Sequence, residues 1–265
     1  MADISAFTSG DVNDSGKVNW RGDQATAPVG QSIYKTSTVK LADLGARVVV
    51  GDRSFRYALA GGAVVGGDFV GKLGVAANGI DTPASTAAGL SYKGDKRFSY
   101  SATLSRAADF YADGYLCQQT GTEGHGGTVY GIKTHTNLAA TTAAQYLILH
   151  DPLVTDVVTS AVGLWYAVEN QYSRVVAASG VHAIAGVAVI SATSGDYFWV
   201  QTWGPSNVRA GVVTAVGAAL TVGLTGACNV ALNSSGNTPI SAVVGHSMQI
   251  MTASTRGLIF VTLAP

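Results

Sequence analysis

The sequence has little charge. Charged residues make up 12% of its 265 residues, and the positive and negative charges cancel, whereas about 25% is usual for soluble domains. Because there is no basic excess to neutralise phosphates, we do not expect nucleic-acid binding. Soluble monomers normally keep a charged surface. The composition therefore favours a subunit that buries much of its surface in an assembly.

Cysteine is scarce too, and long apolar segments are missing. Cys117 and Cys228 form no Cys-x-x-Cys pair, so neither a zinc site nor a disulfide scaffold is expected. The first residues lack the basic and apolar segments of a signal peptide. The apolar stretches 175–192 and 210–227 are interrupted by polar residues and glycines, and they fall short of a transmembrane span. We expect no membrane partner.

The residues that are abundant favour strands. Hydrophobic residues make up 47%, and there are 33 glycines; Val and Thr suit pleated strands, and Gly suits turns. No window of a dozen residues shows an amphipathic helical stripe. The sequence therefore predicts an all-β fold of antiparallel β-sandwich or barrel modules with Gly-rich hairpins. The clearest strands are expected at residues 47–50, 55–59, 98–104, 128–135 and 146–150.

Changes in composition suggest three regions. Residues 1–38 are polar and rich in Gly, Ser, Asp and Thr, which indicates an extended N-terminal arm held by a neighbouring subunit. Residues 39–154 and 155–265 are expected to form two successive β domains. The second of these is the more hydrophobic.

A short pattern occurs three times. Gly51-Asp-Arg-Ser-Phe-Arg-Tyr resembles Gly94-Asp-Lys-Arg-Phe-Ser-Tyr, and Gly195-Asp-Tyr-Phe-Trp-Val is a looser copy. Each copy predicts a turn followed by a strand with alternate aromatic residues on one face. The irregular spacing does not fit a solenoid, so we expect repeated hairpin entries.

The second half contains a long uncharged stretch. The 46 residues between Arg209 and Arg256 include no Asp, Glu, Lys or Arg. Uncharged strands with free edges associate unless those edges are covered. Phe198, Trp199 and Trp203 precede this stretch, and aromatic residues are enriched in interface cores. We expect these three to line the interface of a homo-oligomer, most simply a closed trimer.

Two segments resemble catalytic motifs but lack their context. Gly245-His-Ser-Met-Gln resembles a nucleophile elbow around Ser247, but Gln replaces the second Gly and no acid or His follows, so no triad can be completed in that order. Residues 66–72 have the spacing of a P-loop, but Leu73 stands where a hydroxyl should bind Mg²⁺. No carboxylate pair suits acid–base chemistry. We expect neither enzymatic activity nor a cofactor.

A weak metal candidate lies near the N-terminus. Asp11, Asn13 and Ser15 are spaced like the oxygen ligands of a Ca²⁺ loop, but Gly22 replaces the bidentate acid of such loops, which favours a solvated turn instead. Residues 21–23 spell the adhesion tripeptide Arg-Gly-Asp without further context. The remaining metal-ligand candidates are dispersed histidines without zinc spacing: His125, His135, His150 and His182.

Several strand and turn signatures lie between about residue 40 and the end of the chain. They are Arg53-Ser-Phe-Arg-Tyr-Ala, Gly121-Thr-Glu-Gly, Tyr130-Gly-Ile-Lys-Thr-His, His150-Asp-Pro-Leu-Val-Thr, Tyr197-Phe-Trp-Val-Gln-Thr-Trp-Gly-Pro and Val244-Gly-His-Ser-Met-Gln. In these signatures the chain resembles the head decoration, or capsid cement, proteins of tailed bacteriophages. None of the signatures contains a catalytic residue, and the resemblance does not cover the arm.

The resemblance implies a virion structural protein on the outside of the capsid, made in the cytoplasm of a bacterial host. It implies binding to the major capsid protein around local threefold axes, often as a homotrimer, and stabilisation of the shell. Two alternatives remain open. One is another virion component, such as a tail or fibre-base protein. The other is a carbohydrate-binding β-module that would use Trp165, Trp199 and Trp203.

Overall fold

The computed structural model describes residues 31–73, 91–100, 105–120, 128–139, 145–157, 164–179, 183–223, 225–231 and 243–265. These residues form strands, turns and bends without a helix, and every pair of neighbouring strands is antiparallel. The predicted all-β fold is confirmed. No helix among the described residues is long and apolar enough to cross a membrane.

The chain folds into two compact units. Unit 1 contains the chain up to Leu73 and from Gln171 to Pro265, and unit 2 contains the residues between them. The strands of unit 1 are β1 (Arg47–Val50), β2 (Arg53–Leu59), β3 (Phe69–Lys72), β9 (Val175–Ala177), β10 (Ile184–Ala188), β11 (Tyr197–Arg209), β12 (Ala219–Val222), β13 (Cys228–Val230), β14 (Gly245–Ser247) and β15 (Arg256–Thr262). The strands of unit 2 are β4 (Arg97–Tyr100), β5 (Tyr115–Thr120), β6 (Val129–His135), β7 (Gln145–Leu149) and β8 (Leu164–Val168).

This division differs from the sequential boundary expected at residue 154. That position lies inside unit 2, and strands from both predicted domains pair with one another in unit 1. For example, β2 pairs with β11, and β3 pairs with β10. Unit 2 is thus inserted between β3 and β9, so that unit 1 is discontinuous in sequence.

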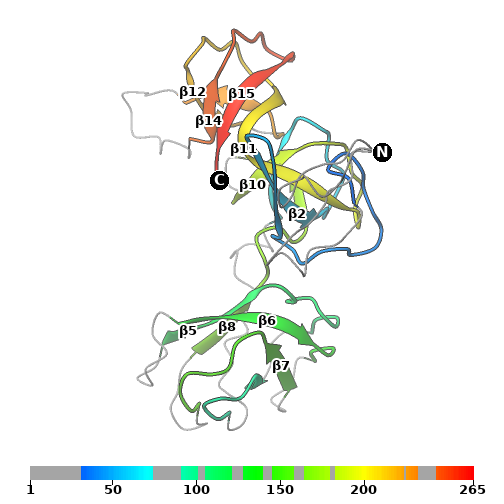
Figure 1. Ribbon diagram of the computed structural model, residues 1–265, viewed down its shortest axis with the longest axis vertical. Helices are drawn as coiled ribbons and strands as arrows, with labels where there is room; N and C mark the ends of the chain where they lie inside the picture. Colours follow the sequence, from blue (N-terminus) through cyan, green and yellow to red (C-terminus); the bar gives the residue numbers. More distant parts are fainter. Residues whose placement is uncertain are drawn as a thin grey trace, which may run out of the picture. The chain divides into compact units, whose positions relative to one another are not determined.

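Unit 1 contains two small barrels that share β11. In the first barrel, pairing runs β2-β11-β10-β3-β9, and Ala60 closes the ring by a parallel bridge to Val175. In the second barrel, pairing runs β11-β15-β14-β12-β13, and Ala210 closes the ring by a parallel bridge to Cys228. Figure 1 shows β12, β14 and β15 to one side of β11, and β2 and β10 to the other.

The two barrels repeat the same pattern of contacts. Strands β2, β3, β9, β10 and β11 of the first correspond in order and pairing to β11, β12, β13, β14 and β15 of the second. The loops between the strands also make the same backbone contacts at corresponding places. These matched contacts are the Val64–Ala192 and Thr214–Met251 bridges, the Gly61–Val175 and Gly211–Cys228 hydrogen bonds, and the Gly67–Ala188 and Gly217–Ser247 hydrogen bonds. Unit 1 is therefore an internal structural duplication.

Strand β11 bends where it leaves one barrel and enters the other. Gly204 has a φ of +90°, a conformation that side chains with a Cβ rarely adopt. A Cβ at Gly204 would also collide with the carbonyl oxygen of Asp52. The side-chain amide of Gln201 donates hydrogen bonds to the carbonyls of Trp203 and Pro205 on either side of the bend, at 3.0 and 2.8 Å.

The recurring turn-and-strand pattern is confirmed. Gly51, Gly94 and Gly195 each occupy a turn directly before a strand, with φ of +60°, +91° and +91°. In the last two copies, the aspartate after the glycine accepts a hydrogen bond from a backbone N–H three residues earlier. A fourth turn of this kind occurs at Ser254, with φ of +64°, before β15.

The described end of the expected arm packs on unit 1 itself. Ile33 is buried in a cluster that includes Tyr57 and Trp199. Backbone hydrogen bonds of 2.9 and 2.7 Å join Ser37 to Tyr197. The hypothesis that a neighbouring subunit holds the arm is therefore wrong for residues 31–37. Residues 1–30 lie outside the described residues.

Unit 2 is a five-stranded sheet in the order β4-β7-β6-β5-β8. One face covers a core that is rich in aromatic residues, including Phe98, Tyr100, Tyr111, Tyr130 and Trp165. His135 is buried beside this core. Its Nε2 accepts the backbone N–H of Tyr111 at 2.9 Å, and its Nδ1 lies 2.6 Å from the carbonyl oxygen of Thr136, so we place the ring proton on Nδ1.

Candidate interaction surface

The motif around Ser247 is structural. Ser247 lies in β14 and is 1% exposed. Its hydroxyl donates to the carbonyl oxygen of Gln249 and lies 3.2 Å from the hydroxyl of Thr214. Both partners belong to the loops that close the second barrel. The hydroxyl therefore holds two loops together.

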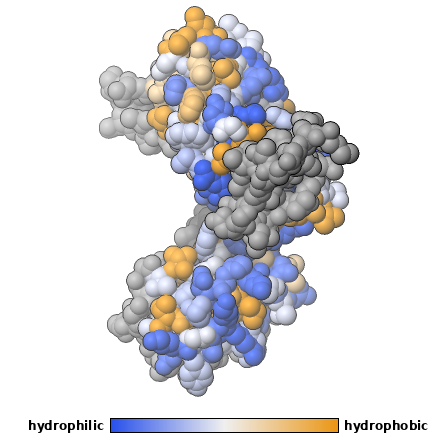
Figure 2. Space-filling view, in the orientation of Figure 1, coloured by the Kyte–Doolittle hydropathy of each residue, from blue (hydrophilic) through white to orange (hydrophobic). Residues whose placement is uncertain are grey.

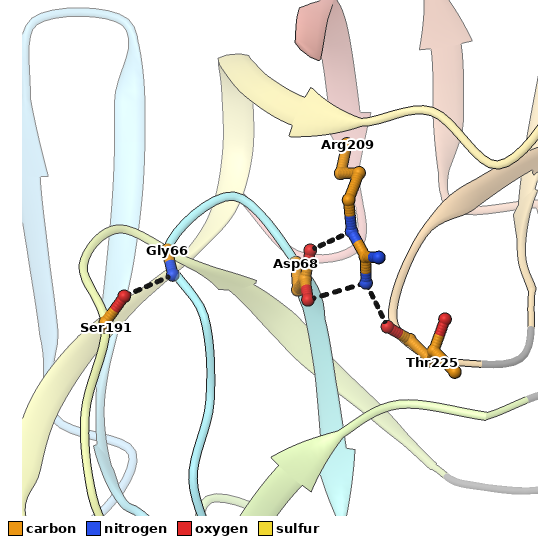
Figure 3. A network of polar contacts seen from close by, with 5 residues as sticks. All are labelled: Gly66, Asp68, Ser191, Arg209 and Thr225. Carbon is orange, nitrogen blue, oxygen red and sulfur yellow. Dashed lines mark hydrogen bonds and ion pairs between the residues drawn. The ribbon is translucent and has the colours of Figure 1, made fainter. Parts of the chain in front are cut away.

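The P-loop-like segment uses its own N–H groups inside the fold. The backbone N–H of Gly66 donates to the hydroxyl of Ser191 at 3.1 Å (Figure 3). The next two N–H groups, of Gly67 and Asp68, donate to backbone carbonyls. Strand β3 follows where a P-loop needs a helix. These three N–H groups are therefore not available to a phosphate.

The remaining candidates for metal or adhesion chemistry divide into two groups. Asp11, Asn13 and Ser15, together with residues 21–23, lie outside the described residues, as do His125 and His182. Of the described histidines, His135 is buried and His150 is exposed. Among the described residues, no group of three or more His, Cys, Asp or Glu could hold a metal ion.

Two of the three residues expected at an interface belong to the core. Phe198 and Trp199 are both 0% exposed. Strands β2 and β10 pair with the two edges of β11 here, and the two side chains pack into separate buried clusters on its opposite faces. Trp203 is partly exposed and packs edge-on against Phe260. Trp165 is buried in unit 2. Phe198 and Trp199 therefore cannot contact a partner, and Trp165 and Trp199 cannot bind a sugar.

A charged network joins the two barrels. Arg209, at the end of β11, donates from Nε and from a terminal nitrogen to the two carboxylate oxygens of Asp68, both at 2.8 Å (Figure 3). The same terminal nitrogen donates to the carbonyl oxygen of Thr225 at 2.6 Å. Asp68 raises the pKa of Arg209, chiefly by accepting these hydrogen bonds. The network ties the start of β3 to the turn between β12 and β13.

An apolar surface of unit 1 lies at the loop end of the second barrel. We define the distal patch as Val212, Val213, Val216, Met248 and Ile250, all of which are exposed. The Thr214–Met251 bridge holds the two contributing loops side by side. Figure 2 shows hydrophobic residues gathered at this end of the unit, at the top of the view.

Two features make the distal patch unusual. Val213, Val216 and Ile250 are 65%, 63% and 71% exposed. All five residues fall within the uncharged stretch between Arg209 and Arg256. Contiguous exposed apolar side chains of this kind mark interaction sites in soluble proteins. The length of the uncharged stretch indicated such a surface, but the sequence did not identify its residues.

Unit 2 presents a second apolar surface, on the sheet face opposite its core. Tyr115 pairs with Val168, and Cys117 pairs with Val129. Paired residues point to the same face, and Tyr115, Val129 and Val168 are exposed. We call this the outer face of unit 2. The sequence could not have located this face by alternation, because Tyr115, Leu116 and Cys117 are all apolar.

Comparison with known proteins gives little information about this chain. No family model matches the chain, and no curated protein matches it. One similar solved structure is the head fiber gp8.5 N base of bacteriophage phi29, with 15% sequence identity. The match covers 63% of this chain and 94% of that chain, with a TM-score of 0.25. A likeness this low does not establish a common fold, so we transfer no function from it.

Proposed function

We propose that the chain is a non-enzymatic structural protein of a tailed-bacteriophage virion that decorates the outside of the capsid and stabilises the shell. The observation that carries this proposal is the distal patch, an exposed apolar surface inside a long uncharged stretch. A surface of this kind needs a partner. The resemblance of the chain from residue 40 onward to head decoration proteins supplies the kind of assembly.

The physical basis of stabilisation is preferential binding. A protein that binds a surface spanning several capsid subunits binds the assembled shell and not the free subunits. Occupied sites then stabilise the shell by mass action, by about 2.7 kcal/mol per site when the free protein is at a hundred times its Kd. The major capsid protein is the partner in this proposal, and neither nucleic acid nor a membrane takes part.

We also propose that the chain has no catalytic activity. The Ser247 hydroxyl and the N–H groups of residues 66–68 serve internal contacts, so the two motif-like segments support the fold. The virion location on the capsid surface, following synthesis in the bacterial cytoplasm, belongs to the same proposal.

The test uses capsids that lack the protein. The purified full chain is mixed with such capsids and, separately, with dissociated capsid subunits, and each mixture is sedimented. We expect a fixed number of copies on each capsid, no binding to free subunits, and a higher rupture temperature in calorimetry. Absence of capsid binding, or an unchanged rupture temperature at full occupancy, would contradict the proposal.

The nearest alternative is that the chain is a tail or fibre-base protein. The reconstituted particles distinguish this alternative from a decoration protein. Cryo-electron microscopy of the reconstituted particles would then show density at a single vertex or at sparse positions. A decoration protein gives density repeated over the whole shell.

A further inference from the structure

The internal duplication of unit 1 provides a control for the distal patch within the same chain. Because the barrels make the same bridges at Val64–Ala192 and Thr214–Met251, positions in their loops correspond one to one. Val212, Val213 and Val216 correspond to Gly62, Ala63 and Gly66 on this basis. Likewise, Ile250 precedes Met251 as Ser191 precedes Ala192.

The first barrel shows that the fold does not require large apolar side chains at four of the five places; the fifth, Met248, corresponds to the apolar Val189. Gly66 and Ser191 make a polar contact, an N–H to hydroxyl hydrogen bond of 3.1 Å (Figure 3). Their counterparts Val216 and Ile250 are apolar and more than half exposed. The same backbone therefore closes with small or polar residues. The side chains of Val213, Val216 and Ile250 do little for folding, because most of their surface stays in water.

At one position the first barrel, and not the second, has the larger exposed apolar residue. Val65 in the first barrel is 50% exposed, and its counterpart in the second barrel is Ala215. Val65 lies between the buried Val64 and Gly66, whereas the distal patch joins five exposed apolar residues from two loops. Val65 therefore serves as a matched control for the loss of exposed valine surface.

The absence of charged residues around the patch limits which surfaces can bind to it. A partner surface that placed a charged group on the patch would bury that charge, and the stretch between Arg209 and Arg256 offers no opposite charge to pair with it. Burial of an unpaired charge costs several kcal/mol. The occupant must therefore be as uncharged and apolar as the patch.

We propose that the occupant is the same patch on other copies of this chain, so that the distal patch forms the centre of a homo-oligomer. Patch meets patch around a symmetry axis, where each copy contributes the same side chains and the ring closes without forming fibres. The chain carries no net charge, so copies approach without long-range repulsion. This self-association does not depend on a capsid.

The experiment measures oligomeric state by sedimentation velocity over a range of concentrations, with the full chain and no capsid present. The test variant combines Val213→Ala with Ile250→Ser, which installs the first-barrel residues in the second barrel. The control is Val65→Ala. A second test variant, Ile250→Asp, places a charge at the same surface position and changes no buried group.

We expect the unchanged chain and Val65→Ala to form the same oligomer. The double variant should need at least about tenfold higher concentration to associate, because several buried methyl groups are lost at each contact, and Ile250→Asp should be monomeric. A monomeric wild-type chain at all concentrations would overturn the inference. So would unchanged oligomers in both test variants. Intact oligomers combined with lost capsid binding would assign the patch to the capsid protein, and this inference would then be wrong even though the proposed function stands.

Discussion

Removing Arg209 should destabilise unit 1 more than removing the charge of its partner Asp68. The side chain of Asp68 is 4% exposed, and that of Arg209 is 36% exposed. In Arg209→Met the Asp68 carboxylate stays buried without its cation, and the Thr225 carbonyl loses its donor. In Asp68→Asn, by contrast, the arginine left behind is partly hydrated, and the amide oxygen still accepts one hydrogen bond.

The magnitudes follow from this asymmetry. Breaking a fully buried ion pair by removing one partner costs about 3–5 kcal/mol. Because water reaches Arg209, we discount that figure to about 2–3 kcal/mol for Arg209→Met, and we expect about 1 kcal/mol for Asp68→Asn. The double variant should lose less stability than the sum of the two single variants, since the buried carboxylate is gone.

The assay is urea unfolding of the full chain, with the two units followed separately. Labelling of the buried Cys228 thiol, in a chain whose Cys117 is replaced by serine, reports unit 1. Fluorescence of Trp165, in a second chain whose other tryptophans are replaced by phenylalanine, reports unit 2. The loss should appear in unit 1 alone. Equal costs for the two single variants, or a larger cost for Asp68→Asn, would refute the reasoning, because it rests on which group is left buried and charged.

Three further outcomes are expected. Burial raises the pKa of the Cys228 thiol from 9.0 to about 11, so the stability that depends on the neutral thiol is complete below pH 9 and is lost as pH rises to 11. That loss amounts to about 2–3 kcal/mol, and Cys228→Ala should flatten this part of a stability–pH curve measured by urea unfolding. His135→Leu leaves the N–H of Tyr111 without its acceptor and should cost unit 2 about 1–3 kcal/mol, seen as faster hydrogen exchange of that amide; unchanged exchange would contradict it. Ser247→Ala removes a buried hydroxyl that bridges two loops and should lower the melting temperature by a few degrees without changing the background rate of ester hydrolysis; a lost esterase activity would reverse our interpretation.

Local sequence patterns predicted the strand content and three of the turns, because these depend on neighbouring residues. A turn that needs positive φ favours Gly, and Gly51, Gly94 and Gly195 all supply it. The Gly-Asp pattern did not predict the fourth turn, because Ser254-Thr255 replaces Gly-Asp there. The hydroxyl of Thr255 bonds within that turn, as the carboxylate of Asp196 does in its own.

Long-range pairing could not be predicted in the same way. Changes in composition suggested a boundary after residue 154, but that position lies inside unit 2. What defines unit 1 is the pairing of β2 and β3 with strands more than a hundred residues away, and no local period encodes it. The apolar run at Phe198 and Trp199 was ambiguous for a related reason, since a strand covered on both faces and an interface strand have the same composition.

The insertion of unit 2 is explained by comparing the two barrels. In the second barrel the connection from β12 to β13 spans only the residues between Val222 and Cys228, and its Gly226 bonds to Phe69 of the first barrel. The equivalent connection from β3 to β9 contains the whole of unit 2. It leaves and re-enters at Leu73 and Arg174, which are hydrogen-bonded to each other at 3.1 Å. A barrel that closes with a short turn at this place does not need unit 2 to fold, and an insertion between adjacent ends leaves the strand pairing unchanged. The strand pairing that closes the barrels depends neither on the outer face of unit 2 nor on the distal patch. The sequences of these two surfaces can therefore diverge independently.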